Sequence, residues 1–142
     1  MRPQRPVLAL ALAAGSLALS ACTEVAEYES TYQPVQIAPV AGSDIQRVTL
    51  TAEAARRIGL ETRRVRRSGR LEVIPYSALV YGDAGETFTI VNPRPLHFVR
   101  TPIRVDRIAG DDVFVSQGPP VGTAVVSTGV AEIYSAEFEV TE

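Results

Sequence analysis

The sequence predicts a mainly β domain, a small β-roll or barrel-like fold with one short helix, preceded by a signal helix and a flexible linker. Turn signals such as Ser68-Gly69, Gly82–Gly85 and Ala109–Asp112 recur between short runs rich in Val, Ile, Thr and Phe. Their spacing of about 8–12 residues is typical of a small all-β domain. No heptad pattern occurs, and about 95 residues after residue 46 suffice for a single modest core.

Residues 1–21 have the pattern of a secretory signal peptide. Arg2 and Arg5 provide a positive start, and an uncharged apolar run covers residues 7–19. This run is shorter than the roughly 20 residues that a transmembrane helix needs. We therefore expect cleavage and export rather than a retained membrane span.

The single cysteine of the chain, Cys22, follows this run directly. The four residues Leu19-Ser20-Ala21-Cys22 resemble the lipobox of bacterial lipoproteins. That resemblance implies acylation of the Cys22 thiol, cleavage before Cys22, and anchoring of the protein in membrane lipid at the extracytoplasmic face of the cell membrane. Two or three acyl chains hold a protein firmly, whereas one chain alone is marginal. The alternative is an ordinary signal peptide that happens to contain a cysteine.

Residues 22–46 are expected to form the lipidated N-terminus and a flexible tether. The segment carries prolines at 34 and 39, several acidic residues and no periodicity. The alternative is that Tyr28, Tyr32 and residues 35–40 dock on the domain as an extra strand.

The domain itself is expected over residues 47–142. A short strand over 47–50 leads into a helix over 51–59, with Thr51 as N-cap and Gly59 as the C-terminal stop. Extended chain follows to residue 81. The later strands are expected over 87–91, 96–108, 113–115 and 123–128, with a chain break at 92–95 and a tail over 129–140 that closes the domain.

Two segments of this region, residues 48–65 and 73–138, resemble periplasmic adaptor proteins, the membrane fusion proteins of efflux pumps. The matching pieces follow in order: Pro75–Val80, Gly85–Ile90, Phe98 with Ile103–Val105, Gly118–Gly122, and Val125, Val126 and Gly129. In full adaptors, lipoyl, hairpin and barrel modules separate the two segments. Here only a turn-length stretch of residues 66–72 stands between them. The resemblance implies a membrane-proximal β-roll in which the two segments pair directly.

The basic residues are all arginine, and they cluster. Removal of a signal containing Arg2 and Arg5 leaves 12 arginines against 16 acidic residues, a net charge of −4, and residues 47–142 carry 12 of each. This balance argues against nucleic-acid binding. Seven arginines lie within 15 residues: Arg56, Arg57, Arg63, Arg64, Arg66, Arg67 and Arg70.

Two interpretations of this cluster stay open. Arg63, Arg64, Arg66, Arg67 and Arg70 are candidates for facing anionic lipid or an acidic surface of a membrane partner. Alternatively, the cluster is a solvated strand edge whose charge blocks strand-to-strand aggregation.

No residues indicate catalysis or a cofactor. His97 has no second ligand nearby in sequence, which disfavours a zinc site. Asp111 and Asp112 lack the spacing of a calcium loop and suit a turn. Ser77, Ser116 and Ser127 have no recognisable base. The loop over 82–85 lacks the ending of a phosphate loop.

We therefore expect a non-catalytic, lipid-anchored accessory protein that docks on an inner-membrane transporter of an efflux or export system. One alternative is a lipoprotein that binds a small ligand or envelope polymer in a cleft lined by Tyr76, Tyr81, Phe88 and Phe98. Another is an adaptor remnant without retained function.

Overall fold

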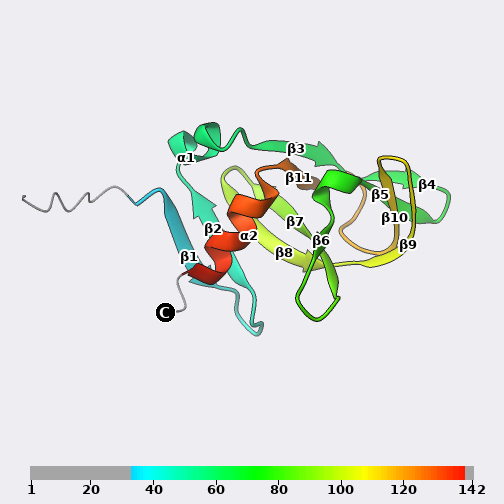
Figure 1. Cartoon of the computed structure of the whole chain (residues 1–142), viewed down its shortest axis with the longest axis horizontal. Helices are drawn as coiled ribbons and strands as arrows, with labels where there is room; N and C mark the ends of the chain where they lie inside the picture. Colours follow the sequence, from blue (N-terminus) through cyan, green and yellow to red (C-terminus); the bar gives the residue numbers. More distant parts are fainter. Residues whose placement is uncertain (1–32, 140–142) are drawn as a thin grey trace, which may run out of the picture. The chain divides into compact units, whose positions relative to one another are not determined.

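Two antiparallel β-sheets form the body of the domain (Figure 1). The computed structural model describes residues 33–139, with side chains to residue 138. The larger sheet contains β1 (Val35–Pro39), β2 (Gln46–Leu50), β3 (Glu61–Arg64), β6 (Val80–Tyr81), β7 (Thr87–Arg94), β8 (His97–Pro102) and β11 (Ala124–Thr128). The smaller sheet contains β4 (Arg66–Ser68), β5 (Leu71–Pro75), β9 (Arg104–Ala109) and β10 (Asp112–Gln117). The helical elements are α1 (Ala52–Arg57), the 3₁₀ turn η1 (Tyr76–Ala78) and α2 (Val130–Glu139).

The mainly β prediction is confirmed, although the sheets do not close into a barrel. The strand order of the larger sheet is β1-β2-β8-β7-β11-β3, with β6 beside β7. The smaller sheet has the order β4-β5-β10-β9. The helix predicted over 51–59 is present as α1, with the Thr51 side chain accepting a hydrogen bond from the Ala54 N–H.

The chain also forms a second helix, α2, that the prediction of one short helix omitted. It follows directly after β11 and Gly129. Ile133 and Glu137 are buried, and Val130 and Tyr134 are partly buried, so one face of α2 packs on the larger sheet at helical spacing. The segment expected to close the domain therefore does so as a helix.

The two segments of the adaptor-like pattern pair directly, as expected. Strand β2 pairs with β8, with Val48 opposite Phe98. Strand β3 pairs with β11, with Arg63 opposite Val125. Strands β2 and β3, from before residue 66, therefore belong to the same sheet as β7, β8 and β11, from after residue 73.

Part of the expected tether belongs to the domain. Residues 35–39 form β1, which pairs antiparallel with β2 from Val35 opposite Leu50 to Pro39 opposite Gln46. The prediction of a tether over 22–46 is therefore wrong for this part, and the docked alternative describes it. Alternating apolar residues explain the pairing, since Val35 and Ile37 pack against the core. Residues 1–21, Cys22, Tyr28 and Tyr32 lie outside the described residues.

The long strand expected over 96–108 is two strands in different sheets. Strand β8 ends at Pro102, which has no N–H to donate to a ladder. Ile103 then inserts into the core between the sheets, and its N–H donates to the Thr87 carbonyl at 2.9 Å. Strand β9 continues in the smaller sheet. The preceding turn is Pro95-Leu96 rather than a break over 92–95, because β7 extends to Arg94.

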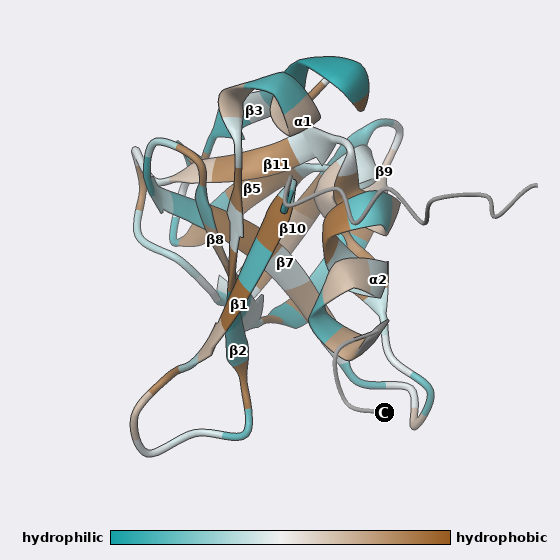
Figure 2. Ribbon diagram, turned by 90° about the vertical axis from the view of Figure 1, so that its left-hand side faces the viewer, coloured by the Kyte–Doolittle hydropathy of each residue, from teal (hydrophilic) through white to brown (hydrophobic). Residues whose placement is uncertain are grey.

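The larger sheet lies between two hydrophobic cores. One core, between this sheet and the helices, contains Phe98, Ile90 and Val126. The other core, between the sheets, contains Ile74 and Val125. Neighbouring residues of β11 thus serve different cores, as the twofold alternation of a strand requires. Figure 2 shows hydrophobic residues concentrated on the central strands, whereas α1 exposes hydrophilic residues.

Candidate interaction surfaces

The arginine cluster runs along two sheet edges. Strand β3 is an edge of the larger sheet, and β4 is an edge of the smaller sheet. Between them, Val65 is only 2% exposed and joins the core between the sheets. All five arginines singled out from the sequence are exposed: Arg63, Arg64, Arg66, Arg67 and Arg70.

Three of these arginines contact other parts of the domain. Arg66 forms an ion pair with Asp112 of β10. The Arg64 Nη1 donates to the Gly122 carbonyl oxygen at 2.7 Å. The Arg63 Nη2 lies 3.9 Å from a carboxylate oxygen of Glu61, a long and exposed contact. These contacts support the interpretation of a solvated, charged edge for this part of the cluster.

Arg67 and Arg70 differ from the other three. Neither side chain has a hydrogen-bond or ion-pair partner among residues 33–139. Arg67 lies on β4 and Arg70 lies in the turn of the β4–β5 hairpin, which is at the opposite side of the domain from β1 (Figure 1). We call this surface the arginine tip. Glu72 lies opposite Arg67 in the β4–β5 ladder, but neither Arg67 nor Arg70 forms an ion pair within the described domain, so both guanidinium groups are available to an external anion.

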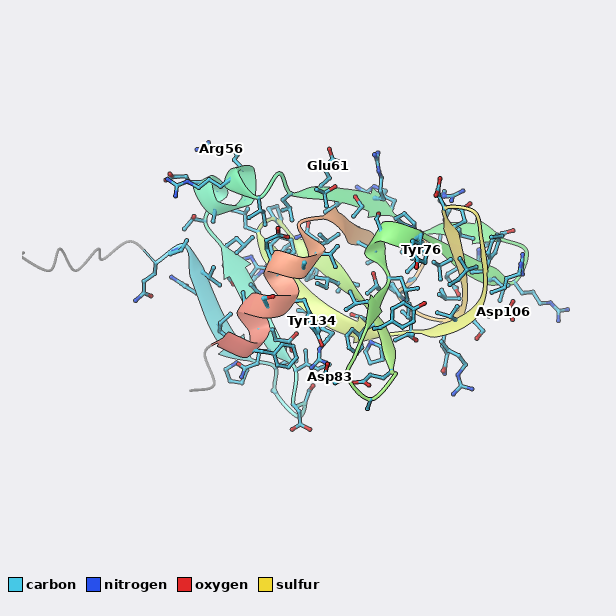
Figure 3. The ribbon with its side chains drawn as sticks, in the orientation of Figure 1. Arg56, Glu61, Tyr76, Asp83, Asp106 and Tyr134 are labelled. Carbon is cyan, nitrogen blue, oxygen red and sulfur yellow. The ribbon has the colours of Figure 1, made fainter. Side chains whose placement is uncertain are left out.

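The aromatic cleft expected for a small ligand is not formed. Phe98 is fully buried and Phe88 is 3% exposed, so both are core residues. Tyr76 and Tyr81 are about half exposed, at 49% and 56%. Tyr76 extends from η1, as the side-chain view shows (Figure 3). The four rings therefore do not line a common cavity.

An apolar groove does occur elsewhere, between the start of β1 and both helices. Its volume is about 380 Å³. The floor and walls come from Val35, Leu50, Ala54, Ile58, Ile133 and Ala136. Pro34, Arg57 and Glu132 also line it. The sequence analysis did not predict this groove, because its lining residues come from two segments that lie up to about 100 positions apart. The only signal in the sequence that could have indicated these residues is their apolar character.

A buried ion pair fastens α2 to the larger sheet. The Arg100 Nε on β8 lies 3.1 Å from the Glu137 Oε2 on α2, and the two side chains are only 17% and 5% exposed. The Arg100 guanidinium also lies over the rings of Phe88 and Phe138, at 4.8 and 5.3 Å from their centroids. The Gln46 N–H donates to the Glu137 Oε1 at 3.3 Å. This cluster ties α2, β2 and β8 together.

The remaining candidate residues are dispersed. His97 has a ring nitrogen 2.9 Å from the Pro95 carbonyl oxygen. Asp112 is paired with an arginine, and Ser116 donates to a backbone carbonyl. Over residues 33–139, no group of three or more His, Cys, Asp or Glu residues could hold a metal ion. No helix in this range is long and apolar enough to cross a bilayer.

The comparisons with known proteins give no match. No protein-family model, curated protein or solved structure matches the chain significantly.

Proposed function

We propose that the protein is a non-catalytic, lipid-anchored accessory subunit that docks on the extracytoplasmic face of an inner-membrane transporter through its arginine tip. The lipobox-like sequence ending at Cys22 supports the anchor. The adaptor-like order of the two segments, and their direct pairing through β2–β8 and β3–β11, support a transporter as the partner.

The observation that carries the docking surface is the unpaired charge of Arg67 and Arg70. Both residues belong to the β4–β5 hairpin, in which β4 is an edge strand of the smaller sheet. An exposed guanidinium can bind a carboxylate through two parallel hydrogen bonds, which gives a docking contact its direction. We therefore expect a partner surface rich in Asp or Glu.

The absence of the expected aromatic cleft supports docking over ligand capture at that place. Phe88 and Phe98, expected to line a ligand cleft, are core residues.

Affinity isolation of the intact lipoprotein from membranes in mild detergent tests the proposal. We expect recovery of transporter components with the wild-type protein and at least a tenfold loss with the Arg67→Gln/Arg70→Gln variant, since each lost charged contact is worth roughly 1.5–3 kcal/mol. The matched control is Arg56→Gln/Arg94→Gln, which removes the same charge from exposed positions elsewhere. Recovery of no transporter component, or equal recovery with both double variants, would count against the proposal.

A further inference from the structure

Strand β1 differs in charge from the other strands that end the two sheets. The strand orders of the sheets end at β1, β3, β4 and β9 within residues 33–139. Strands β3, β4 and β9 each carry at least two charged side chains, whereas β1 has the sequence Val-Gln-Ile-Ala-Pro and carries none. Charged side chains on an edge strand oppose pairing with another chain. The edge at β1 lacks this protection.

The hydrogen-bond pattern of β1 shows which of its backbone groups face outward. Hydrogen-bonded and non-hydrogen-bonded pairs alternate along an antiparallel ladder. Just outside β1, the Thr51 N–H donates to the Pro34 carbonyl oxygen and the Val40 N–H donates to the Ile45 carbonyl oxygen, each at 3.0 Å. Pro34 and Val40 therefore belong to hydrogen-bonded pairs, and so do the even-numbered residues between them. The odd-numbered residues direct their backbone groups away from β2.

Val35 and Ile37 thus each present an N–H and a carbonyl oxygen at the open edge of β1. These groups have no backbone hydrogen-bond partner within residues 33–139. Figure 1 shows no other labelled strand or helix on the outer side of β1. Pro39 presents only a carbonyl oxygen there, because proline has no N–H. The open edge therefore has unpaired donors and acceptors concentrated on the stretch from Val35 to Ile37.

We propose that β1 pairs with β1 of a second copy of the chain, in an antiparallel arrangement with the twofold axis at Gln36. In this register Val35 lies opposite Ile37 of the second copy, and each of the two symmetric pairs exchanges two backbone hydrogen bonds. An axis at Ile37 would instead place Val35 opposite Pro39 and leave the Val35 carbonyl oxygen without a donor. Among pairings within β1 itself, the axis at Gln36 therefore satisfies the open groups of Val35 and Ile37.

The chemistry of the axis also suits a second copy. Gln36 is exposed and uncharged, so two copies of this side chain meet at the axis without repulsion. An amide group both donates and accepts hydrogen bonds, which lets it pair with its own symmetry mate. The same patch on both partners is what a twofold interface requires.

The pairing joins the two larger sheets into one continuous sheet. Because the arginine tip lies at the opposite side of the domain from β1, the pair carries its two arginine tips at its outer ends (Figure 1). One pair can then contact two partner surfaces. This consequence rests on the proposed docking function, whereas the pairing itself does not.

Cysteine crosslinking in cells that express the full-length chain tests the pairing. Two residues 36 at the axis form a non-hydrogen-bonded pair with Cα atoms about 4.5 Å apart, which is within the range of a disulfide. Under a mild oxidant we expect Gln36→Cys to appear mainly as a disulfide dimer. The matched control is Ala38→Cys on the same strand, which lies opposite Pro34 of the second copy and should stay mainly monomeric. The wild type reports any crosslink through Cys22.

Dimers with neither variant, equal amounts of dimer with both, or dimers with Ala38→Cys alone would overturn the inference.

A second measurement places charge at the axis and uses copies that carry two different tags. With Gln36→Glu in both copies, two carboxylates lie directly opposite each other, and co-isolation should fall roughly two- to fivefold from the wild-type level. Combining Gln36→Glu with Gln36→Lys should restore it, which a damaged fold would not do. Equal co-isolation in every combination would contradict the pairing. Neither readout depends on a transporter, so failure here is separate from failure of the proposed docking function.

Discussion

Replacement of Glu137 by Gln should be among the most damaging conservative changes in the domain. The substitution keeps the size of the side chain and one acceptor oxygen for the Gln46 N–H. It removes the negative charge that faces Arg100, whose side chain is only 17% exposed. The Arg100 guanidinium then stays between two phenyl rings without a counter-charge.

The size of the expected loss of stability follows from the burial of the Arg100–Glu137 ion pair. Breaking a buried ion pair by removing one partner costs about 3–5 kcal/mol. Because Arg100 retains some contact with solvent, we expect a value near the lower limit, about 3 kcal/mol. A small domain loses about 4–8 °C in Tm per kcal/mol, so Tm should fall by roughly 12–24 °C. Urea titration followed by circular dichroism measures the free energy of unfolding.

An exposed pair provides the matched control. Glu53→Gln removes the partner of Arg57 in an ion pair whose side chains are 70% and 45% exposed. Exposed helical pairs of this spacing contribute only about 0.3–0.5 kcal/mol. If Glu137→Gln costs no more than Glu53→Gln, the ion pair does not hold α2 on the sheet and the reasoning is refuted.

Four further substitutions test the fold by the same urea titration. Gly129→Ala should lower the free energy of unfolding by about 2–3 kcal/mol, because the φ of Gly129 is +87° and an added Cβ would lie 3.0 Å from the Ile58 Cδ1. Gly42 has a φ of +73° but open space around it, so Gly42→Ala should lower the free energy of unfolding by only about 1–2 kcal/mol. Equal costs would disprove the steric part of that argument. Thr51→Ala removes the N-cap of α1 and should cost about 1 kcal/mol; no loss would mean that the cap is not stabilising. Phe98→Ala should cost about 3–5 kcal/mol, and a loss below 1 kcal/mol would contradict its place at the centre of the core.

Local signals in the sequence predicted the local structure well. Thr51 caps α1, and Gly59 follows the helix with a φ of +62°, as expected for a C-terminal stop. The turns at 68–69, 82–85 and 109–112 connect strands at the expected places. These features depend on the conformational preferences of single residues, so they can be recognised without knowledge of distant contacts.

The pairing of the two distant segments was expected from the adaptor resemblance, but other features that depend on distant contacts were not predicted. The switch at Ile103 requires a second sheet to receive β9. Pro102 marks a break in the run of 96–108, but the sequence does not show that the chain continues in another sheet. Glu137 of α2 pairs with Arg100, 37 residues away, and no local signal in the sequence marks this contact. The Arg66–Asp112 pair, which separates the neutralised arginines from the free ones, spans 46 residues. The charge of the arginine cluster was readable from the sequence, but its division into paired and free members was not.

The pairing of β2 with β8 and of β3 with β11 has a kinetic consequence. Each partnership joins segments about 50–60 residues apart, so the larger sheet cannot be completed until most of the chain is present. Sheets that depend on such remote partners assemble slowly, on the order of milliseconds to seconds. A chain that is still emerging, from a ribosome or along the proposed export route, therefore lacks the complete larger sheet until β11 is available to pair with β3.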